Sequence, residues 1–350
     1  MNRSKSAINV SPVRIELDPI FHAVEDGVCI DWLVDTQGLH AQLRSSSQRL
    51  AELRLQNSET TSELQLLLAD SEHTLPFRLL ARSLEWLWWQ AGTPRQLQLS
   101  EALRRLFAVP KGWCDDDGLI DCSDFFQQPL LWYFGDNGGG KPLSWVENDK
   151  GLRHPQRRPL PNGLLYQRYL PNLDTVLSFR KLDPALDLDR FCHWMQQSRV
   201  AEFWELAKPR EELARYLDTV LADAHLQPVV GCFDDEPFGY FELYWALEDR
   251  IGPHYDAAPF DRGAHLLVGE SRFLGRQYGV AWLNGISHFL FLDDARTMRL
   301  VGEPRADNSK LLKYLTMTSW HKVKEFDFPH KRAALVTCER ERFFQETEFT

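Results

Sequence analysis

The sequence predicts a mixed α+β fold in its second half, preceded by a smaller α+β domain. From Thr175 onward the runs read strand, helix, helix, three strands, helix, strand, helix and two strands. That order suits a mixed sheet with helices on both faces, of the α+β or the α/β class. The 350 residues exceed what one core usually serves, and the composition changes after Phe134 to a Gly-, Pro- and charge-rich segment. We therefore expect domains over residues 1–150 and 164–350.

The N-terminal domain is expected to open with a loosely ordered start and the strand "VCIDWLV". Residues 45–70 have apolar side chains at helical spacing and predict a helix with a break in its middle. A second helix, "PFRLLARSLEWLWWQA", has Pro76 in its first turn and precedes the strand "RQLQLS". Trp86, Trp88 and Trp89 favour core or interface packing over an aromatic binding box, because aromatic side chains dominate both kinds of burial.

Residues 135–163 are predicted to connect the domains, because they show no sustained periodicity. The stretch "GGGK" at 138–141 lacks the spacing of a phosphate-binding P-loop and a following helix, which favours a flexible linker. Asp115, Asp116 and Asp117 are adjacent acids without a nearby histidine, which favours a solvated loop over a metal site.

The C-terminal elements follow from periodicity and from turn residues. The strand "TVLSFRKL" precedes the helix "DLDRFCHWMQQ", opened by Asp187, and the helix "PREELARYLDTVLAD", with Pro209 in its first turn. A hairpin turning at 234–237 and the apolar strand "GAHLLVGE" follow. The helix "QYGVAWLNGISHFLFL", the strand "TMRLVG", the helix "SKLLKYLTM" and the strands "HKVKEFDF" and "RAALVTCE" complete the order. Asp307 or Asn308 is expected to cap the helix that follows the corner "EPRADN".

The composition limits the partners. A net charge of −10 argues against nucleic acid, which needs a basic face. Six cysteines without a C-x-x-C pair indicate a reducing compartment and no thiolate zinc site. The N-terminus lacks the apolar core of a signal peptide, and no apolar run is long enough to span a bilayer. We expect a cytoplasmic protein that binds no nucleic acid, no membrane and no metal.

The passage "HLLVGESRFLGRQYGVAWL" carries the clearest candidate site. A buried strand ends at Glu270, a loop carries Gly275, Arg276 and Gly279, and a helix begins at once. The first amides of that helix and its positive dipole end favour an anion, and Arg276 adds charge. A pyrophosphate is the natural occupant. The spacing alone is not specific, since glycine turns between strand and helix are common.

Four strings resemble the GNAT superfamily of acyl-CoA N-acyltransferases: "GYFELYWALEDRIG", "PFDRGAHLLVGE", "EPRADN" and "KEFDFPHKR". More narrowly, they resemble its siderophore branch, the hydroxylysine and hydroxyornithine acetyltransferases. The resemblance runs from about Tyr166 to Phe344 and is weak at best over residues 1–150, whose role stays open and which we interpret as a possible degenerate GNAT-like copy. It implies the GNAT fold, a mixed twisted sheet that splays near "HLLVGE", where the pantetheine arm of acetyl-CoA inserts.

The resemblance also implies site residues. Residues near the strand end and in the loop would contact the coenzyme: Leu267, Val268, Gly275, Arg276, Gln277, Tyr278 and Gly279. The loop "GRQYG" departs from the family by lacking Gly or Ala at every second position, so its amide donors stay open. His265 and Asp307 match the family's histidine and aspartate that face the acceptor hydroxylamine. The alternatives are a buried histidine satisfied by a neighbour and a helix cap.

Acceptor recognition has four candidates, each of which suits a structural role equally well: Trp204, Glu242, Tyr244 and Asp249. His330, Lys331 and Arg332 are candidates for a carboxylate or the nucleotide end of the coenzyme, with a solvated turn as the alternative. The implied function is acetyl-CoA-dependent N-acylation of N6-hydroxylysine or N5-hydroxyornithine to a hydroxamate in siderophore biosynthesis. The expected partners are this small-molecule hydroxylamine and other siderophore-pathway enzymes.

Two other functions remain open from the sequence. One is a GNAT enzyme that acylates an unmodified amine, and the other is a non-catalytic scaffold subunit that binds acyl-CoA. The length of the acceptor is not readable, because one methylene changes only the depth of a cavity. Acetyl is equally not separable from succinyl or longer acyl donors.

Overall fold

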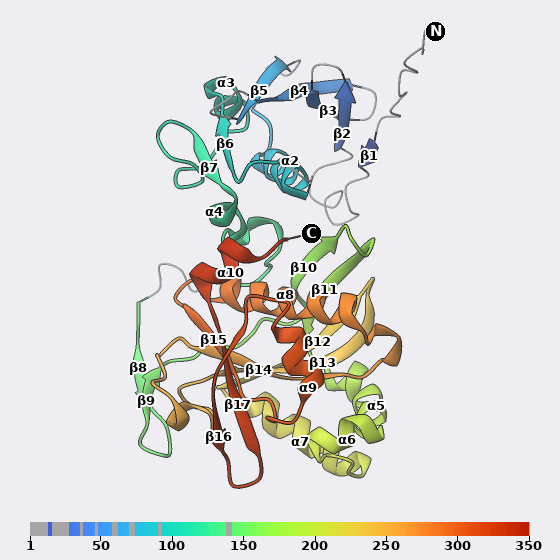
Figure 1. Ribbon diagram of the computed structural model, residues 1–350, viewed down its shortest axis with the longest axis vertical. Helices are drawn as coiled ribbons and strands as arrows, with labels where there is room; N and C mark the ends of the chain where they lie inside the picture. Colours follow the sequence, from blue (N-terminus) through green and yellow to red (C-terminus); the bar gives the residue numbers. More distant parts are fainter. Residues whose placement is uncertain are drawn as a thin grey trace, which may run out of the picture. The chain divides into compact units, whose positions relative to one another are not determined.

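The computed structural model describes most of the chain and divides it into two compact units (Figure 1). The first comprises residues up to Leu131 together with Phe349, and the second runs from Trp132 to Glu348. Each unit is considered by itself. The described residues are 13–15, 28–35, 38–45, 48–57, 62–69, 74–89, 93–137 and 142–349.

The first unit is built on a seven-stranded sheet whose spatial order follows the chain from β1 to β7. Adjacent strands of this sheet pair antiparallel, except β5 and β6, which pair parallel. The strands are β1 (Val13–Ile15), β2 (Val28–Asp35), β3 (Gly38–Ser45), β4 (Gln48–Asn57), β5 (Ser62–Ala69), β6 (Gln96–Leu99) and β7 (Leu119–Asp121). The helices are α2 (Phe77–Trp89), α3 (Glu101–Leu106), α4 (Cys122–Phe126) and the short η1 (Pro129–Leu131).

The predicted helix over 45–70 is wrong, because this segment forms the hairpin strands β4 and β5. Burial along β4 alternates with a period of two: Ala51, Leu53 and Leu55 are buried, whereas Glu52 and Arg54 are half-buried. The run "LAELRLQ" fits both a helical and an alternating pattern, and pairing with β3 on one side and β5 on the other selects the strand.

The other elements predicted for this unit are present as β2, α2 and β6. Trp88 packs its ring 4.9 Å from that of Phe125 and donates its indole N–H to Pro94 O at 3.0 Å, in keeping with core packing. The stretch at 138–141 lies outside the described residues.

The second unit carries an eight-stranded mixed sheet in the order β10-β11-β12-β13-β14-β15-β17-β16. Only β14 and β15 pair parallel. The strands are β10 (Leu164–Leu170), β11 (Thr175–Lys181), β12 (Leu226–Phe233), β13 (Glu236–Trp245), β14 (Arg262–Val268), β15 (Arg299–Gly302), β16 (His321–Asp327) and β17 (Arg332–Glu339). A separate hairpin joins β8 (Trp145–Glu147) to β9 (Arg153–Pro155), inside the segment predicted as a connection.

Helices cover both faces of this sheet, as Figure 1 shows. Successive residues of β13 point to opposite faces of the sheet. The Phe241 ring lies 6.0 Å from that of Trp282 in α8, and the Tyr240 ring lies 4.9 Å from that of Phe191 in α5. The mixed sheet with helices on both faces is therefore confirmed. The α-helices are α5 (Pro184–Met195), α6 (Ser198–Trp204), α7 (Arg210–Ala222), α8 (Arg276–Asp293), α9 (Ser309–Leu315) and α10 (Arg340–Glu346), beside the short turns η2 (Gly252–His254) and η3 (Ser271–Phe273).

The start of α5 corrects the prediction that Asp187 opens this helix. Asp183 is the cap, since its carboxylate accepts a hydrogen bond from Ala185 N at 2.9 Å, and Pro184 occupies the first turn. The Asp187 carboxylate instead accepts hydrogen bonds from both terminal nitrogens of Arg180, each at 2.7 Å. The strand β10 and the helices α6 and α10 have no counterpart in the sequence-based order.

The two units share part of their order of elements. In the first, β5 leads through α2 to the parallel β6, and then through α3 to the antiparallel β7. In the second, β14 leads through α8 to the parallel β15, and α9 precedes the antiparallel pair β16 and β17. None of the helices that the structure describes is long and apolar enough to cross a membrane.

Candidate active site

The site begins where β14 separates from β15. These strands pair only at Arg262 with Leu300 and at Gly263 with Val301, whereas β14 pairs with β13 along its whole length. Just beyond β14, Gly269 N donates a hydrogen bond to Phe238 O of β13 at 2.7 Å. Because the hydrogen-bonding direction alternates along a strand, Leu267 turns its backbone groups toward β13, while Leu266 and Val268 turn theirs into the gap.

Two side chains of α6 reach the carbonyls on this open edge. Trp204 donates its indole N–H to Leu266 O at 3.2 Å, and Arg199 donates to the carbonyls of Val268 and Gly269. Of the two predicted strand contacts for the coenzyme, Val268 therefore presents its backbone to the gap. Leu267 has its side chain buried in the core on the α5 and α7 face, at 4% exposure.

The predicted phosphate loop forms the start of α8. Gly275 precedes the helix with φ of 122°, a conformation that favours glycine, and no side chain caps the first turn. Gly279 N makes the 2.9 Å bond to Gly275 O, so the amides of residues 276–278 lie ahead of the intrahelical ladder. Arg276 and Gln277 are exposed beside them. This is the geometry of an anion site at a helix N-terminus.

The remaining two predicted loop residues face the protein. The Tyr278 ring packs 5.1 Å from that of Phe233 and 5.2 Å from that of Phe273. A side chain at Gly279 would place its Cβ 3.0 Å from the ring of Tyr314 in α9. Their side-chain positions thus serve the packing of α8, and any coenzyme contact here falls to backbone.

His265 lies on β14 directly opposite Glu242 of β13 and joins two buried carboxylates. Its Nδ1 is 3.3 Å from Glu242 Oε2, and its Nε2 is 3.2 Å from Glu303 Oε1. Burial alone lowers the pKa of His265, but the charge of Glu303 and hydrogen bonds to Glu242 and Glu303 raise it to about 10. The ring is therefore an imidazolium at neutral pH, which donates two hydrogen bonds.

Glu303, which our sequence reasoning did not assign to the site, stands at its centre. It follows the last residue of β15 and is 5% exposed. Burial raises the pKa of its carboxyl, but the positive charges of His265, Lys331 and Arg250 hold it well below its usual range. Arg250 donates to Glu303 Oε1 at 2.8 Å, and Lys331 donates to Glu303 O at 2.7 Å. Its position directly after an apolar strand is the signal that could have identified it from the sequence.

The four residues predicted to recognise the acceptor differ in their contact with His265. Glu242 accepts hydrogen bonds from the hydroxyls of Tyr216 and Tyr240, so it is fixed toward His265. Tyr244 donates to Glu303 Oε2 or to Val301 O, each at 3.1 Å, and its ring lies 4.7 Å from that of His265.

Asp249 lies in a turn, where it accepts from Ile251 N at 3.0 Å and approaches His225 at 3.8 Å. Glu242 and Tyr244 therefore join the His265 cluster, Trp204 borders the open edge, and Asp249 supports the turn beside them.

Asp307 stands apart from the cluster in this structure. Its carboxylate is 68% exposed and pairs with Arg305 at 2.7 and 3.0 Å; the hydrogen bonds from Arg305 hold the pKa of Asp307 below its usual range. Across residues 142–349, no hydrogen bond or ion pair joins Asp307 to His265. The cap of α9 is Asn308, which accepts from Leu311 N at 3.1 Å.

Of the predicted basic residues His330, Lys331 and Arg332, only Lys331 contacts the candidate site among the described residues. Lys331 belongs to the Glu303 cluster, whereas Arg332 pairs with exposed Glu325 at 2.8 Å and His330 stacks on Phe328 with ring centroids 5.5 Å apart. The site thus offers an open strand edge, an uncapped helix start and a half-buried cationic histidine between carboxylates.

Comparison with known proteins gives consistent matches. A family model described as an acetyltransferase (GNAT) domain matches residues 183–328. The N(6)-hydroxylysine O-acetyltransferase of Escherichia coli is 42% identical over 245 residues, covering 67% of this chain and 78% of that protein. The N(5)-hydroxyornithine:cis-anhydromevalonyl coenzyme A-N(5)-transacylase of Beauveria bassiana is 41% identical, covering 74% of this chain and 56% of that protein. The solved structure of an uncharacterized protein from Bacillus halodurans matches with a TM-score of 0.50 and 30% identity, over 52% of this chain and 93% of its own.

Proposed function

Because this chain belongs to the GNAT acetyltransferases, together with the hydroxylysine enzyme of Escherichia coli, we propose that it acylates a hydroxylamine nitrogen. The acceptor is N6-hydroxylysine or N5-hydroxyornithine, the donor is acetyl-CoA, and the product is a hydroxamate for siderophore biosynthesis. The observation that carries this is the half-buried His265 beside an open strand edge that leads to an uncapped helix start. The printed names of the relatives supply the acceptor class.

The donor fits the gap between β14 and β15. The pantetheine amides pair with the backbone of Leu266 and Val268, and the pyrophosphate rests on the amides that begin α8. Arg276 is exposed at that point and adds the positive charge that a pyrophosphate needs. The thioester then lies near His265, because His265 immediately precedes the exposed edge of β14.

The reaction asks for orientation more than for a strong base. A hydroxylamine nitrogen is largely neutral at pH 7, so its lone pair attacks the thioester carbonyl without prior deprotonation. The carbon–sulfur bond breaks, the nitrogen loses its proton, and the coenzyme leaves as the thiol. His265 contributes positive charge beside the reacting atoms, while its two ring nitrogens stay paired with Glu242 and Glu303. Asp307 offers an exposed carboxylate to the acceptor on the same corner as Glu303.

The test is a panel of acceptors with two readouts. The protein is incubated with acetyl-CoA and N6-hydroxylysine, N5-hydroxyornithine, lysine or ornithine, and free thiol is followed. Ferric chloride then reports hydroxamate, which forms only on N-acylation, so it separates the N-acyl product from the O-acyl product that the printed name of one relative describes. Thiol release and ferric colour with a hydroxylated acceptor support the proposal. Equal rates with lysine favour an ordinary amine acetyltransferase, and coenzyme binding without turnover favours the scaffold function.

We also propose that the first unit is a degenerate GNAT-like copy. Its β5-α2-β6-α3-β7 order resembles the β14-α8-β15-α9-β16-β17 order, which has β16 as an additional strand, and β5 and β6 pair at only two positions, as β14 and β15 do. The segment before α2 has no glycine loop like "FLGRQYG", and Pro76 precedes the helix. We expect no coenzyme binding there, which equilibrium dialysis tests: a stoichiometry of one acetyl-CoA per chain agrees, and two would contradict it.

A further inference from the structure

Arg250 donates hydrogen bonds to Glu303 from one edge of its guanidinium and leaves the other edge unused. Nε and Nη2, which form the first edge, donate to Glu303 Oε1 at 3.3 and 2.8 Å. The second edge comprises Nη1 and the remaining N–H of Nη2. Among the residues that the structure describes, Nη1 has no hydrogen-bond partner. The Arg250 side chain is 48% exposed, so this second edge is open to a ligand.

The contacts of the first edge hold the second edge in place. Glu303 is 5% exposed and also contacts His265 and Lys331, so it is itself fixed. The Arg250 guanidinium lies 5.8 Å from the centroid of the Phe328 ring. A side chain held by a buried carboxylate and an aromatic ring loses little conformational entropy when a ligand binds, so the second edge is preorganised.

This second edge lies close to the position proposed for the reacting atoms. Arg250 Nη2 is 3.3 Å from His265 Nε2, and His265 directly precedes the open edge of β14. Both groups are donors at neutral pH, so this is a contact between two cations that share Glu303 rather than a hydrogen bond. An anionic group of a ligand on the second edge lowers that repulsion.

The charges that act on His265, Arg250 and Glu303 balance before a ligand binds. Three cations face three carboxylates, and three minus three leaves no net charge; the groups are His265, Arg250 and Lys331 against Glu303, Glu242 and Asp249. Behind Asp249, His225 and Asp223 pair with each other at 2.6 Å. A zwitterionic amino acid with a neutral hydroxylamine keeps this balance, whereas a hydroxylated diamine adds the positive charge of its ammonium.

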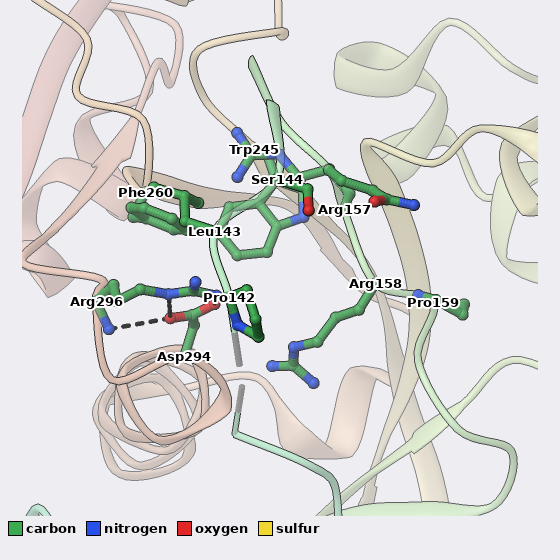
Figure 2. A pocket seen from close by; sticks show the side chains of 11 residues that line it. Pro142, Leu143, Ser144, Arg157, Arg158, Pro159, Trp245, Phe260, Asp294 and Arg296 are labelled. Atoms are coloured by element: carbon green, nitrogen blue, oxygen red, sulfur yellow. Dashed lines mark hydrogen bonds and ion pairs between the residues drawn. The ribbon is translucent and has the colours of Figure 1, made fainter. Parts of the chain in front are cut away.

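A cavity of about 290 Å³ in the same unit is no alternative place for the acceptor (Figure 2). Trp245 lines it and follows Glu242 by three residues on β13, so the two side chains leave opposite faces of the sheet. Glu242 points to His265, and the cavity therefore lies across the sheet from the reacting atoms. In its lining, Asp294 already pairs with Arg296 at 2.7 Å.

We propose that Arg250 binds the α-carboxylate of the acceptor, so that the enzyme prefers hydroxylated α-amino acids to hydroxylated diamines. This inference rests on the proposed acyl transfer and names its acceptor class. The carboxylate accepts from Nη1 and Nη2 of the second edge, the two-pronged geometry that arginine forms with carboxylates. Extended hydroxyornithine and hydroxylysine span about 6 and 7 Å from carboxylate carbon to hydroxylamine nitrogen. Both lengths exceed the 3.3 Å between Arg250 and His265, so the nitrogen can lie beside His265.

The first measurement is acceptor binding to the full-length protein saturated with CoA, which has no acyl group to transfer. Isothermal titration calorimetry compares N6-hydroxylysine with N-hydroxycadaverine, and N5-hydroxyornithine with N-hydroxyputrescine. Each diamine lacks only the carboxylate of its partner. The better amino acid should bind at least about tenfold more tightly than its diamine, since hydrogen bonds between charged groups are the strong ones.

Arg250→Lys separates recognition of the carboxylate from a structural role. Lysine keeps a positive charge beside Glu303 but has no second edge, so the ratio of the two affinities should fall at least about fivefold. The ratio of the two kcat/KM values in the acylation assay should fall likewise, because damage common to both acceptors cancels in a ratio. Arg332→Lys is the matched control: Arg332 is 59% exposed and pairs with Glu325, and the ratio should stay within about twofold.

The outcomes separate this inference from the proposed reaction. If the amino acid binds more tightly than its diamine but no acceptor yields hydroxamate, the acyl transfer is wrong and the assignment of the carboxylate stands. Equal affinities for the amino acid and its diamine, or no measurable binding of either amino acid, would overturn the assignment even if hydroxamate forms. An unchanged ratio in Arg250→Lys would equally remove Arg250 from that role.

Discussion

Replacing Glu303 by Gln tests the charge cluster at the centre of the candidate site. The substitution keeps the shape of the side chain and removes one negative charge. In the wild type, Glu303 contacts His265, Arg250 and Lys331. With that charge gone, the pKa of His265 must fall from about 10 toward its ordinary value near 6.5.

The size of the effect follows from that shift. The difference between 10 and 6.5, at about 1.4 kcal/mol per unit, corresponds to ~5 kcal/mol for all partners of His265 together. Breaking a buried ion pair by removing one partner costs ~3–5 kcal/mol, which agrees. Since the folded-state pKa of His265 is raised, this stabilisation is fully present below pH 6.5 and is lost as the pH rises through about 10.

Urea unfolding of wild type and Glu303→Gln at pH 7, 8, 9 and 10 measures this. The variant should lose about 3–5 kcal/mol of unfolding free energy at pH 7, and its deficit should shrink steadily toward pH 10. Glu325→Gln, which removes a solvent-facing partner of Lys322 and Arg332, is the matched control and should change little at any pH. A deficit that stays constant from pH 7 to pH 10, or no deficit at all, would refute the protonated state of His265.

Three further predictions concern the proposed reaction and coenzyme site. His265→Ala and Asp307→Ala should each lower kcat for the hydroxylated acceptor by about two orders of magnitude while acetyl-CoA affinity stays within about twofold; near-full turnover of a folded variant would make that residue structural. Arg276→Gln should raise KM for acetyl-CoA roughly three- to tenfold with kcat preserved, and an unchanged KM places the pyrophosphate elsewhere. Gly279→Val should lower the melting temperature because its Cβ meets the Tyr314 ring, whereas a wild-type melting curve would contradict the 3.0 Å approach.

Much of the C-terminal order of elements was predictable because proline, glycine or turn residues mark the ends of many of its helices and strands. Pro209 and Gly275 mark the starts of α7 and α8, and the hairpin turn at 234–235 has two residues with positive φ, whereas the start of α5 at Pro184 was not predicted. The first unit was less readable. Its strands β4 and β5 alternate Leu with Glu, Gln and Arg, residues that also favour helices, and only cross-strand pairing resolves them.

The candidate site was partly predictable for a related reason. His265 and the loop that begins α8 stand inside recognisable strings, so the sequence pointed to them. Glu303 contacts His265 across 38 residues of chain, and Arg250 contacts Glu303 across 53, so no local sequence pattern links them. The cavity at Trp245 gathers residues from 142 to 296, and no local pattern announces it.

The side chains of Trp204 and Arg199 donate hydrogen bonds to carbonyls at the open edge of β14. An unpaired strand edge recruits other strands, which is a route to aggregation. The carbonyls of Leu266, Val268 and Gly269 beside that edge accept hydrogen bonds from α6. A guest in the gap must replace those bonds with donors of its own. If the proposed coenzyme lies along this edge, the amide N–H groups of its pantetheine arm can replace those bonds, whereas an acetyl thioester without the arm carries no such donor.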